Sequence, residues 1–479
     1  MSKSFQAFVL IAALLFVANL FFGNGLLRIL EPWELDFLRY SRTAESINSI
    51  PALVQSFALD SFGPDSNYLR LGGLGIMLFS LFAFISLSRP LFGREVTTAF
   101  FLVAASSPVL VFLMKISIPD LWLAGVHLMS IPFLLRGLKQ PQIIWSTGFG
   151  ILMLLGGFMH PGPNLLWYLL WIGALIVLHP QGKRLINIQY WWPLPFLVYQ
   201  YFSIDPGDGW LFYWGSVKPL FSLLIFFLIP IIWVGFFSGG LRDLFWKVRK
   251  KEESGLIFLS WFIAAFFTLS PALGLLFLLI AAKQLQLFFT NNYPWKSWVR
   301  SAEVFALISF FLLAIAFVFN QFESLGAGAL RYTLIVIGLF WASAFWAVIG
   351  VFSVDRSWIV GGKAFVGLVP VFIAIILLLP FLERDNNWQK ELLVKQVPEF
   401  LEKNDLPVEV PICFADSLKA DPQLSILLEL SKHSPSNGKP CLSLQVVGQQ
   451  TDKRKLTDKF PLPITGKPVG ERYYLELEN

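Results

Sequence analysis

Residues 67–114 read NYLRLGGLGIMLFSLFAFISLSRPLFGREVTTAFFLVAASSPVLVFLM. Two apolar runs, 67–87 and 96–114, flank a short turn that carries Arg89 and Arg94. Each run is close to the length of about 20 residues that a helix needs to cross the hydrocarbon core of a bilayer. A spanning segment must also satisfy its own backbone hydrogen bonds, so each run is predicted to be a helix. The stretch therefore predicts two consecutive transmembrane helices.

The same pattern extends over most of the chain. Of its 479 residues, 56% are hydrophobic and 14% are charged, whereas roughly 25% of residues are charged in soluble domains. This composition excludes a disordered chain, a nucleic-acid-binding protein and an ordinary cytosolic enzyme. We predict about 13 transmembrane helices, at about 5–24, 67–87, 96–114, 121–136, 142–159, 164–179, 190–203, 219–239, 255–270, 272–290, 302–320, 331–353 and 363–382.

The loops between the predicted spans differ in basic residues. Alternate loops are rich in Lys and Arg, most of all the loop at 242–251, which holds Arg242, Lys247, Arg249, Lys250 and Lys251. Arg356 and Lys363 are counted with the loop before the last span. Because basic loops stay in the cytoplasm, the N-terminus is predicted to be cytoplasmic and the C-terminus extracytoplasmic. The prediction is a multi-pass protein of a bacterial inner membrane with a periplasmic C-terminal domain.

The charge content changes near Leu382. Residues 1–382 hold 24 Lys/Arg and 16 Asp/Glu, and residues 383–479 hold 13 and 15 in a quarter of that length. We therefore predict a transmembrane domain, 1–382, followed by a soluble domain, 383–479. The second domain shows helical spacing at 392–403 and 423–432 and strand-like runs at 410–414 and 441–447. The predicted fold class is an all-α polytopic membrane protein with a small C-terminal α/β domain.

The two cysteines, Cys413 and Cys441, both lie in the C-terminal domain. In a periplasmic compartment they can pair as a disulfide. Two buried free thiols fit the sequence equally well.

Acidic residues gather in two segments on the predicted outer side. The first is the loop 25–66, where helical spacing places Asp36, Arg39 and Tyr40 on one face. Its apolar residues suit a helix at the membrane interface. The second is the turn before the fourth span, where Lys115 precedes Asp120. A single Asp at a helix start commonly acts as a cap, but carboxylates near lipid are costly and usually functional. Two acids on one side, close to basic residues, favour a functional site.

These motifs, in this order, resemble the GT-C membrane glycosyltransferases of the protein O-mannosyltransferase and lipid A aminoarabinose transferase group. The matching stretches are Asp36-Phe-Leu-Arg39-Tyr40, Arg70-Leu71, Arg89-Pro-Leu-Phe-Gly-Arg94, Asp120-Leu-Trp-Leu and Gly157-Phe-Met-His160-Pro-Gly-Pro163. The chain departs from the family at three places. Phe37 replaces a second acid, His160 replaces a Lys, and Ser61-Phe-Gly-Pro-Asp65 stands where the family has an E-K-P stretch.

The resemblance implies a GT-C-like fold and transfer of a sugar, with inversion, from a polyprenyl-phosphate donor to a lipid, glycan or protein acceptor at the outer face. An attacking hydroxyl needs a base, for which Asp36 is the candidate. Asp120 is predicted to orient the acceptor, to hold a partner of Asp36 or to help bind a metal. The leaving phosphate needs cations or donors, and the candidates are Arg39, Arg70, Lys115 and His160. Acceptor or loop shaping is assigned to Glu34, Tyr40, Asp205 and Asp208.

Several of these residues also have a structural interpretation. Arg39 can snorkel to lipid head groups, and Arg70 can anchor a helix at the interface. His160 fits an ordinary turn residue, and Tyr40 a packing residue. The segment containing Asp205 and Asp208 fits a plain turn.

Cofactors and competing functions complete the predictions. Glu34-Leu-Asp36 has the spacing of a D-x-D-like pair, and carboxylates with water can hold Mg²⁺ or Mn²⁺. The prediction is nevertheless a metal-free mechanism without any cofactor.

Two other functions stay open. One alternative is a catalytically degenerate homologue that acts as a membrane scaffold, which Phe37 and the missing E-K-P stretch favour. The other is a transporter, which predicts internal repeats and broken or charged helices near the midplane.

Overall fold

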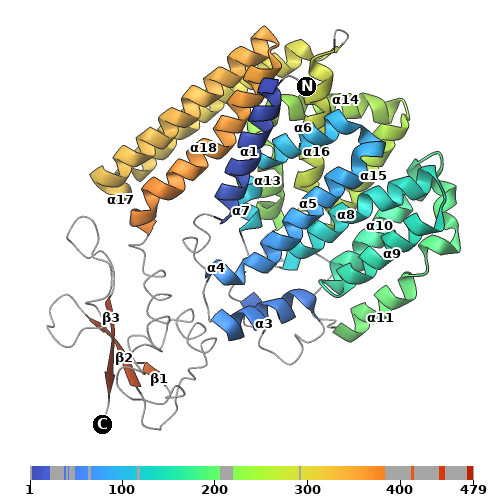
Figure 1. Ribbon diagram of the computed structural model, residues 1–479, viewed down its shortest axis with the longest axis horizontal. Helices are drawn as coiled ribbons and strands as arrows, with labels where there is room; N and C mark the ends of the chain where they lie inside the picture. The colour runs from blue at the N-terminus through green and yellow to red at the C-terminus, as the bar shows by residue number, and fades with distance from the viewer. Residues whose placement is uncertain are drawn as a thin grey trace. The chain divides into compact units, whose positions relative to one another are not determined.

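The computed structural model describes residues 3–21, 37–38, 41, 49–62, 66–115, 119–204, 219–290, 293–382, 412–414, 442–447 and 472–477 (Figure 1). The chain divides into two compact units. Unit 1 comprises Met1–Phe22, Asn48–Pro51 and Gly73–Ala374, and unit 2 comprises Gly23–Ile47, Ala52–Gly72 and Ile375–Asn479.

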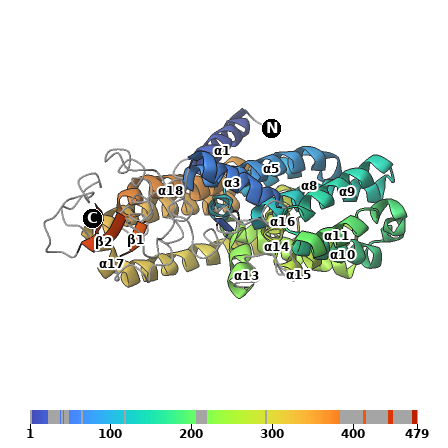
Figure 2. The same ribbon diagram turned by 90° about the horizontal axis from the view of Figure 1, so that it is seen from below.

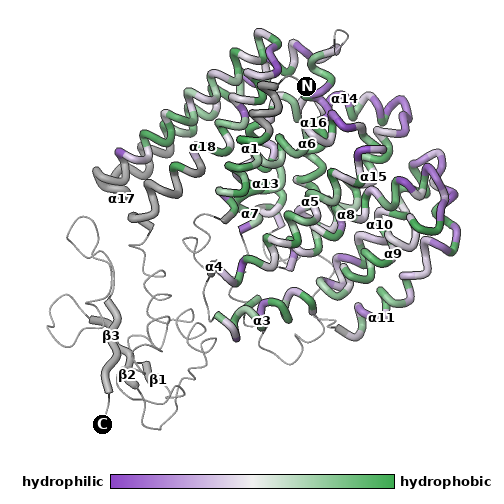
Figure 3. The backbone as a smooth tube through the Cα atoms, viewed as in Figure 1, coloured by the Kyte–Doolittle hydropathy of each residue, from purple (hydrophilic) through white to green (hydrophobic). Residues whose placement is uncertain are grey.

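The helices follow the predicted spans closely. Those that match one predicted span each are α1 (Lys3–Phe21), α5 (Leu71–Phe92), α8 (Pro119–Lys139), α9 (Ile143–Gly157), α10 (Pro161–Leu178), α11 (Leu194–Ile204), α15 (Glu253–Thr268), α16 (Ala272–Phe288) and α18 (Arg356–Leu382). Figure 3 shows hydrophobic residues along them and hydrophilic residues at ends such as the turn from α14 to α15. Within the described residues, five helices are long and apolar enough to cross a membrane, or seven counting each of two bent pairs as one span. Four shorter apolar helices accompany them, and the count of about 13 stays a prediction.

The two spans predicted at 302–320 and 331–353 lie in one helical run, α17 (Lys296–Ser353), which folds back on itself. Its two apolar arms are Lys296–Ala316 and Arg331–Ser353. The Phe310 ring lies 5.6 Å from the Phe340 ring, and Arg300 donates from Nη2 to the Phe352 carbonyl at 3.1 Å. The arms are therefore antiparallel neighbours, as two consecutive spans must be.

Two of the predicted spans are bent. The span at 96–114 consists of α6 (Arg94–Ala105) and α7 (Pro108–Met114), which meet at 74°. Ser107 caps α7 by accepting a hydrogen bond from the Leu110 amide at 3.2 Å, and Pro108 begins the helix. Proline is suited to this first position because its missing N–H has no partner in the helix. The span at 219–239 consists of α13 (Pro219–Leu228), η5 (Ile231–Trp233) and α14 (Val234–Arg249), with a bend of 48°.

The two bends are hydrogen-bonded to each other inside unit 1. Ser107 Oγ donates to the Ile229 carbonyl at 2.6 Å, and Trp233 Nε1 donates to Ser106 Oγ at 2.8 Å. A broken helix frees backbone groups that lipid cannot satisfy, so these groups need partners from the protein. The buried serines supply such partners, since Ser107 Oγ donates to the Ile229 carbonyl and Ser106 Oγ to the Leu102 carbonyl at 2.7 Å, and the Trp233 indole holds the Ser106 hydroxyl. This explains how a membrane domain tolerates both bends.

Helix α18 passes close to the first bend at Gly367. A Cβ on Gly367 would lie 1.6 Å from the Ser106 carbonyl oxygen. We expect Gly367→Ala to lower the free energy of unfolding by at least about 1–3 kcal/mol, because a backbone atom blocks the added methyl group. Thermal unfolding of the purified protein in detergent measures the change. Gly338→Ala in α17 is the control, since nothing lies within 4 Å of its Cβ position, and an equal loss in both variants would contradict the packing.

The remaining helices of unit 1 pack pairwise around aromatic side chains. Figures 1 and 2 both show α8 beside α9 and α10 beside α15. Trp167 and Trp171 of α10 and Trp261 of α15 are fully buried. Helix α1 joins α18 through Asn19, whose Nδ2 donates to the Leu368 carbonyl at 3.1 Å. The packing fixes the ends of α7, α8, α9 and α10, where the candidate site lies.

Unit 2 contains a three-stranded sheet of order β1-β2-β3. Its strands are β1 (Ile412–Phe414), β2 (Leu442–Val447) and β3 (Arg472–Leu477). The first two confirm the predicted strands, and the third was not predicted. β1 and β2 are parallel, and β2 and β3 are antiparallel. A parallel pair needs a crossover connection, and the predicted helices at 392–403 and 423–432 fall outside the described residues.

The two cysteines of the C-terminal domain are only partly described. Cys413 lies in β1 and Cys441 outside the described residues, so their pairing stays a prediction.

Candidate functional site at the ends of α7, α8 and α10

Three predicted site residues come from three helix ends of unit 1. Lys115 is the C-cap of α7, Asp120 lies in the first turn of α8, and His160 is the N-cap of α10. Their exposed fractions are 2%, 0% and 5%. Burying ionisable groups is costly unless they interact with other polar groups. The negative charge of Asp120 acts on the His160 ring, so the structure brings these two residues into one electrostatic environment.

The turn before His160 is held by a polar side chain of α10. Asn164 donates from Nδ2 to the Met153 carbonyl at 2.8 Å and accepts from His127 Nε2 at 3.1 Å. The His127 ring is stacked on Trp167 with 4.2 Å between the centroids. A Cβ on Gly156 would lie 2.4 Å from Asn164 Oδ1, so this close approach requires glycine. The α8–α9–α10 packing therefore fixes the backbone that presents His160.

The end of the long first loop contacts the same turn. The Ile50 amide donates to the Phe158 carbonyl at 2.9 Å. Ile50 also packs against a buried apolar cluster that includes Trp122 and Met159. Residues 48–51 belong to unit 1. One end of the segment that carries the predicted motif Asp36-Phe-Leu-Arg39-Tyr40 is thus anchored beside His160.

His160 has an open hydrogen-bonding position. Its Nδ1 atom is buried and has no hydrogen-bond partner among the described residues. Burial lowers the pKa of the ring below its usual value of 6.5, and the charge of Asp120 opposes part of this shift. The ring is therefore neutral at neutral pH. A buried polar atom without a partner calls for an explanation such as a bound ligand.

The lowered pKa of His160 predicts a loss of stability in acid. The unfolded chain takes up a proton on this residue near pH 6.5, whereas the folded chain resists protonation to a lower pH. The unfolded state binds more protons in that interval, so the free energy of unfolding falls as the pH falls below the unfolded pKa. We expect a smaller acid-induced drop in the thermal midpoint for His160→Gln than for the wild type. An identical drop would show that His160 is not held neutral.

The remaining predicted site residues fall into two groups. Those outside the described residues are Glu34, Asp36, Arg39, Tyr40, Asp205 and Asp208. Of the segment around Asp36 the structure describes Phe37, Leu38 and Ser41, and the Ser41 amide donates to the Phe37 carbonyl at 2.9 Å. Phe37 and Leu38 are 5% and 1% exposed, so the apolar side predicted to lie at the membrane interface is buried.

Arg70 lies in unit 2, between α4 (Ser66–Leu69) and α5. Its side chain is 1% exposed and takes part in interactions with other groups. A fully buried guanidinium does not extend into lipid head groups as a snorkelling side chain does. The burial argues against an anchoring role and is compatible with the predicted role in phosphate binding.

Gln200 of α11 is a polar residue that the sequence did not single out. Its Nε2 donates to the Leu154 carbonyl at 3.2 Å, and its Oε1 is buried with no partner among the described residues. A Cβ on Gly157 would lie 1.9 Å from this oxygen. The signal in the sequence is the Gly156-Gly157 pair at the end of α9, because such glycines indicate close approach of another group.

The described residues hold no group of three or more His, Cys, Asp or Glu side chains suited to a metal ion. Glu34 and Asp36, the predicted D-x-D-like pair, are outside that set.

Comparison with known proteins identifies the architecture. No protein-family model matches the sequence, and no curated protein is similar to it. The crystal structure of ArnT from Cupriavidus metallidurans bound to undecaprenyl phosphate matches with a TM-score of 0.61 and 14% identity, over 92% of this chain and 93% of that one. The chain has the GT-C fold. The resemblance expected from the motifs is confirmed at the level of the fold, because ArnT, a lipid A aminoarabinose transferase, is a GT-C protein.

Two further structures match the chain. ArnT from the same organism in the apo state gives a TM-score of 0.59 with 14% identity, over 92% of each chain. An oligosaccharyltransferase from Archaeoglobus fulgidus, in complex with Zn and sulfate, gives 0.44 with 14% identity, over 89% of this chain and 62% of that one. The ArnT matches cover nearly the whole length of both chains, so the GT-C fold applies to the chain as a whole.

Proposed function

We propose that the chain is an integral membrane glycosyltransferase that moves a sugar from a polyprenyl-phosphate donor to an acceptor at the extracytoplasmic face. The observation that carries this proposal is the GT-C fold shared over 92% of the chain with an ArnT structure bound to undecaprenyl phosphate. The lipid, glycan or protein nature of the acceptor is left open, and so is the sugar. The proposed location is a bacterial inner membrane, with the C-terminal domain in the periplasm.

The donor phosphate is proposed to bind at the ends of α7 and α10. Lys115 supplies a buried positive charge, and His160 supplies a neutral ring whose buried Nδ1 is open to a hydrogen bond. Charge-assisted hydrogen bonds are roughly twice as strong as neutral ones, which suits a leaving group that gains negative charge. Arg39 and Arg70, which the sequence also assigns to the donor phosphate, lie in unit 2, and their role stays a prediction.

The transfer step is proposed to be a single displacement with inversion. The acceptor oxygen forms a bond to the anomeric carbon as the bond from that carbon to the phosphate oxygen breaks. The acceptor proton goes to Asp36, and the electron pair of the broken bond stays on the polyprenyl phosphate. Asp120 is proposed to orient the acceptor, and Glu34, Tyr40, Asp205 and Asp208 are proposed to shape its site. No metal is required in this mechanism, and undiminished transfer after EDTA treatment is the expected result.

Lys115→Met tests the phosphate site. Losing one charge-assisted hydrogen bond costs about 1.5–3 kcal/mol, so we expect kcat/KM for the polyprenyl-phosphate sugar to fall about 10- to 150-fold. Transfer of labelled sugar in membranes measures it. Lys139→Met, at the exposed far end of α8, is the matched control and should transfer like the wild type. Equal activity of both variants would remove Lys115 from the site.

The transporter alternative gains some support from the structure. Bent helices and a buried ion pair between α17 and α18 are features that it predicts. Sugar uptake into proteoliposomes without an acceptor distinguishes the two functions. A transporter accumulates sugar on one side, whereas the proposed transferase leaves the sugar distribution unchanged.

A further inference from the structure

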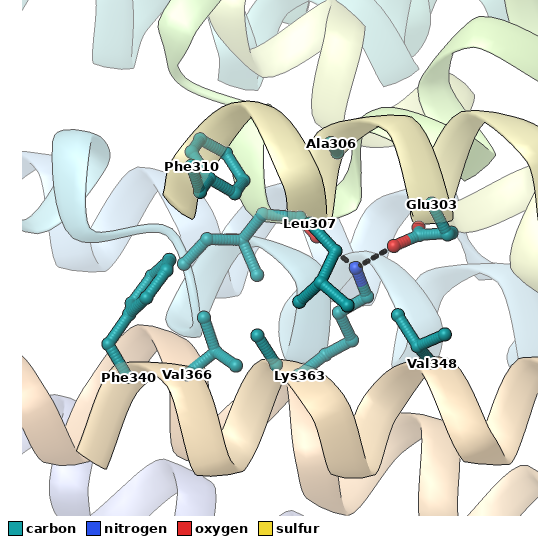
Figure 4. Close-up of a pocket in the computed structure, with 10 residues that line it drawn as sticks. Glu303, Ala306, Leu307, Phe310, Phe340, Val348, Lys363 and Val366 are labelled. Atoms are coloured by element: carbon teal, nitrogen blue, oxygen red, sulfur yellow. Dashed lines mark hydrogen bonds and ion pairs between the residues drawn. The ribbon is translucent and has the colours of Figure 1, made fainter. Parts of the chain in front are cut away.

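The basic side chains of unit 1 differ in whether the protein supplies an acidic partner. The Lys363 ammonium of α18 binds Glu303 Oε2 of α17 (Figure 4). The sequence placed Lys363 in a loop, but α18 begins at Arg356 and buries it. In α14, Lys247 Nζ binds Asp243 Oδ2 at 2.5 Å, one turn away along the helix. The positive charges of both lysines are therefore compensated inside the fold.

Two exposed arginines of α14, Arg242 and Arg249, differ from these lysines. No acidic side chain among the residues that the structure describes forms an ion pair with either guanidinium group. The two arginines are seven residues apart, which is about two turns of helix, so they lie on the same face about 10 Å apart along the axis. This face of α14 therefore carries two positive charges that the described part of the protein does not compensate.

Tryptophan rings hold both guanidinium groups. Arg242 Cζ lies 4.2 Å from the ring centroid of Trp295 and 4.8 Å from that of Trp298. Arg249 Cζ lies 5.3 Å from the ring centroid of Trp246. Stacking on an aromatic ring leaves the N–H groups at the edge of a guanidinium able to bind the oxygens of a phosphate in pairs. Both arginines are thus positioned for an oxyanion.

Large apolar side chains are exposed beside these charges. Phe245 is 63% exposed, Leu241 and Trp246 are each 39% exposed, and Trp298 of α17 is 45% exposed. Exposed rings next to basic residues are typical of protein surfaces that contact phospholipid head groups. We call this surface the Arg–Trp face, and its residues are Leu241, Arg242, Phe245, Trp246, Arg249 and Trp298.

Helix stability does not account for the Arg–Trp face. A basic residue near the C-terminal end of a helix interacts favourably with the last carbonyl groups, but this effect is confined to the last turn. Arg242 lies two turns before Arg249, the last residue of α14. The predicted cytoplasmic orientation explains the presence of basic residues here, but it does not require them to stack on tryptophan rings beside an exposed Phe245.

We propose that the Arg–Trp face binds the head groups of anionic phospholipids, of the phosphatidylglycerol class. The lipid phosphate accepts hydrogen bonds from Arg242 and Arg249, and acyl carbons contact Phe245. Charge complementarity selects this class, because a zwitterionic lipid would bring its own cation towards the arginines and towards the exposed Lys250 and Lys251 at the same helix end. The exposed rings favour a lipid over a soluble acidic protein, because they gain from an apolar environment.

Lipid competition in native mass spectrometry tests the proposal. The purified wild type is stripped of lipid in detergent and offered equal amounts of dioleoyl phosphatidylglycerol and dioleoyl phosphatidylcholine. We expect preferential binding of phosphatidylglycerol. The double variant Arg242→Gln with Arg249→Gln should bind its first phosphatidylglycerol about 30-fold more weakly, since each basic residue near an anionic lipid surface contributes about fivefold. Equal binding of the two lipids by the wild type, or unchanged binding of phosphatidylglycerol by the double variant, would overturn the proposal.

A matched control separates the Arg–Trp face from overall charge. Lys139→Gln with Lys183→Gln removes two exposed basic residues, at the end of α8 and in η2 (Gly182–Ile186), and should bind phosphatidylglycerol like the wild type. An equal loss in this control would contradict the site. A dimer that only the arginine variant dissociates would assign the face to a second copy of the chain and would also overturn the proposal.

Folding of the arginine variant is checked by its thermal midpoint in lipid-free detergent. If that midpoint falls, Arg249→Gln alone, at the exposed end of α14, replaces the double variant. Its expected loss is about fivefold, and undiminished binding of phosphatidylglycerol by a folded Arg249→Gln protein would contradict the proposal.

Discussion

Replacing Asp36 with Asn is expected to lower kcat for sugar transfer by about 100- to 10,000-fold, the usual contribution of a general base. The amide has nearly the same shape as the carboxylate but cannot take the proton of an attacking hydroxyl. The measurement is transfer of label from a pool of polyprenyl-phosphate sugars in membranes that contain equal amounts of each protein.

Asp60→Asn, in the exposed part of α3 (Ile50–Phe62), is the matched control and should retain full transfer. Normal folding of Asp36→Asn is checked by its thermal midpoint. If both variants transfer sugar at the wild-type rate, Asp36 is not the base. Because Phe37 replaces the second acid of the family motif, failure of the wild type itself would favour the scaffold alternative.

The second large effect concerns stability. Lys363→Met leaves the Glu303 carboxylate buried without its counter-ion and the Ile232 carbonyl without its donor. Removing one partner of a buried ion pair costs about 3–5 kcal/mol, because the remaining charge is uncompensated. We therefore expect a large fall in the thermal unfolding midpoint of the purified protein.

Two comparisons make this prediction specific. Adding Glu303→Gln to Lys363→Met should recover most of the lost stability, since it removes the uncompensated charge. Lys247→Met breaks a more exposed pair with Asp243, at 19% and 21% side-chain exposure, and should cost about 0–1 kcal/mol. If Lys363→Met alone is as stable as the double variant, an unpaired Glu303 carboxylate does not destabilise the folded protein, and the prediction is contradicted.

Hydropathy was enough to place the helices, because a lipid-solvated helix must be continuously apolar over a fixed length. It did not reveal the bend at Ser106 and Ser107, since an apolar run looks the same whether straight or broken. The sequence carried a signal there, because serine before proline is a typical helix start. The fold-back of α17 was predictable, since two apolar arms flank a polar segment.

The site was harder to predict, because its residues are brought together only by packing. Lys115 and Asp120 were singled out by their place in a predicted outer turn, and His160 through motif resemblance; all three are buried at the helix ends on which they lie. Asn164 is positioned by its contacts with Met153 and His127, whose pairing no local pattern specifies. Glu303 and Lys363 are 60 residues apart; Lys363 was counted with a loop and Glu303 was not singled out, so their pairing was not predicted.

Binding of undecaprenyl phosphate to the purified wild-type protein tests the central claim most directly, because it requires no knowledge of the sugar or the acceptor. Undecaprenol, which has the same chain without the phosphate, serves as the comparison ligand. The proposed function predicts saturable binding of undecaprenyl phosphate that undecaprenol does not match. Absence of saturable binding, or equal binding of the two lipids, would contradict a polyprenyl-phosphate-dependent transferase.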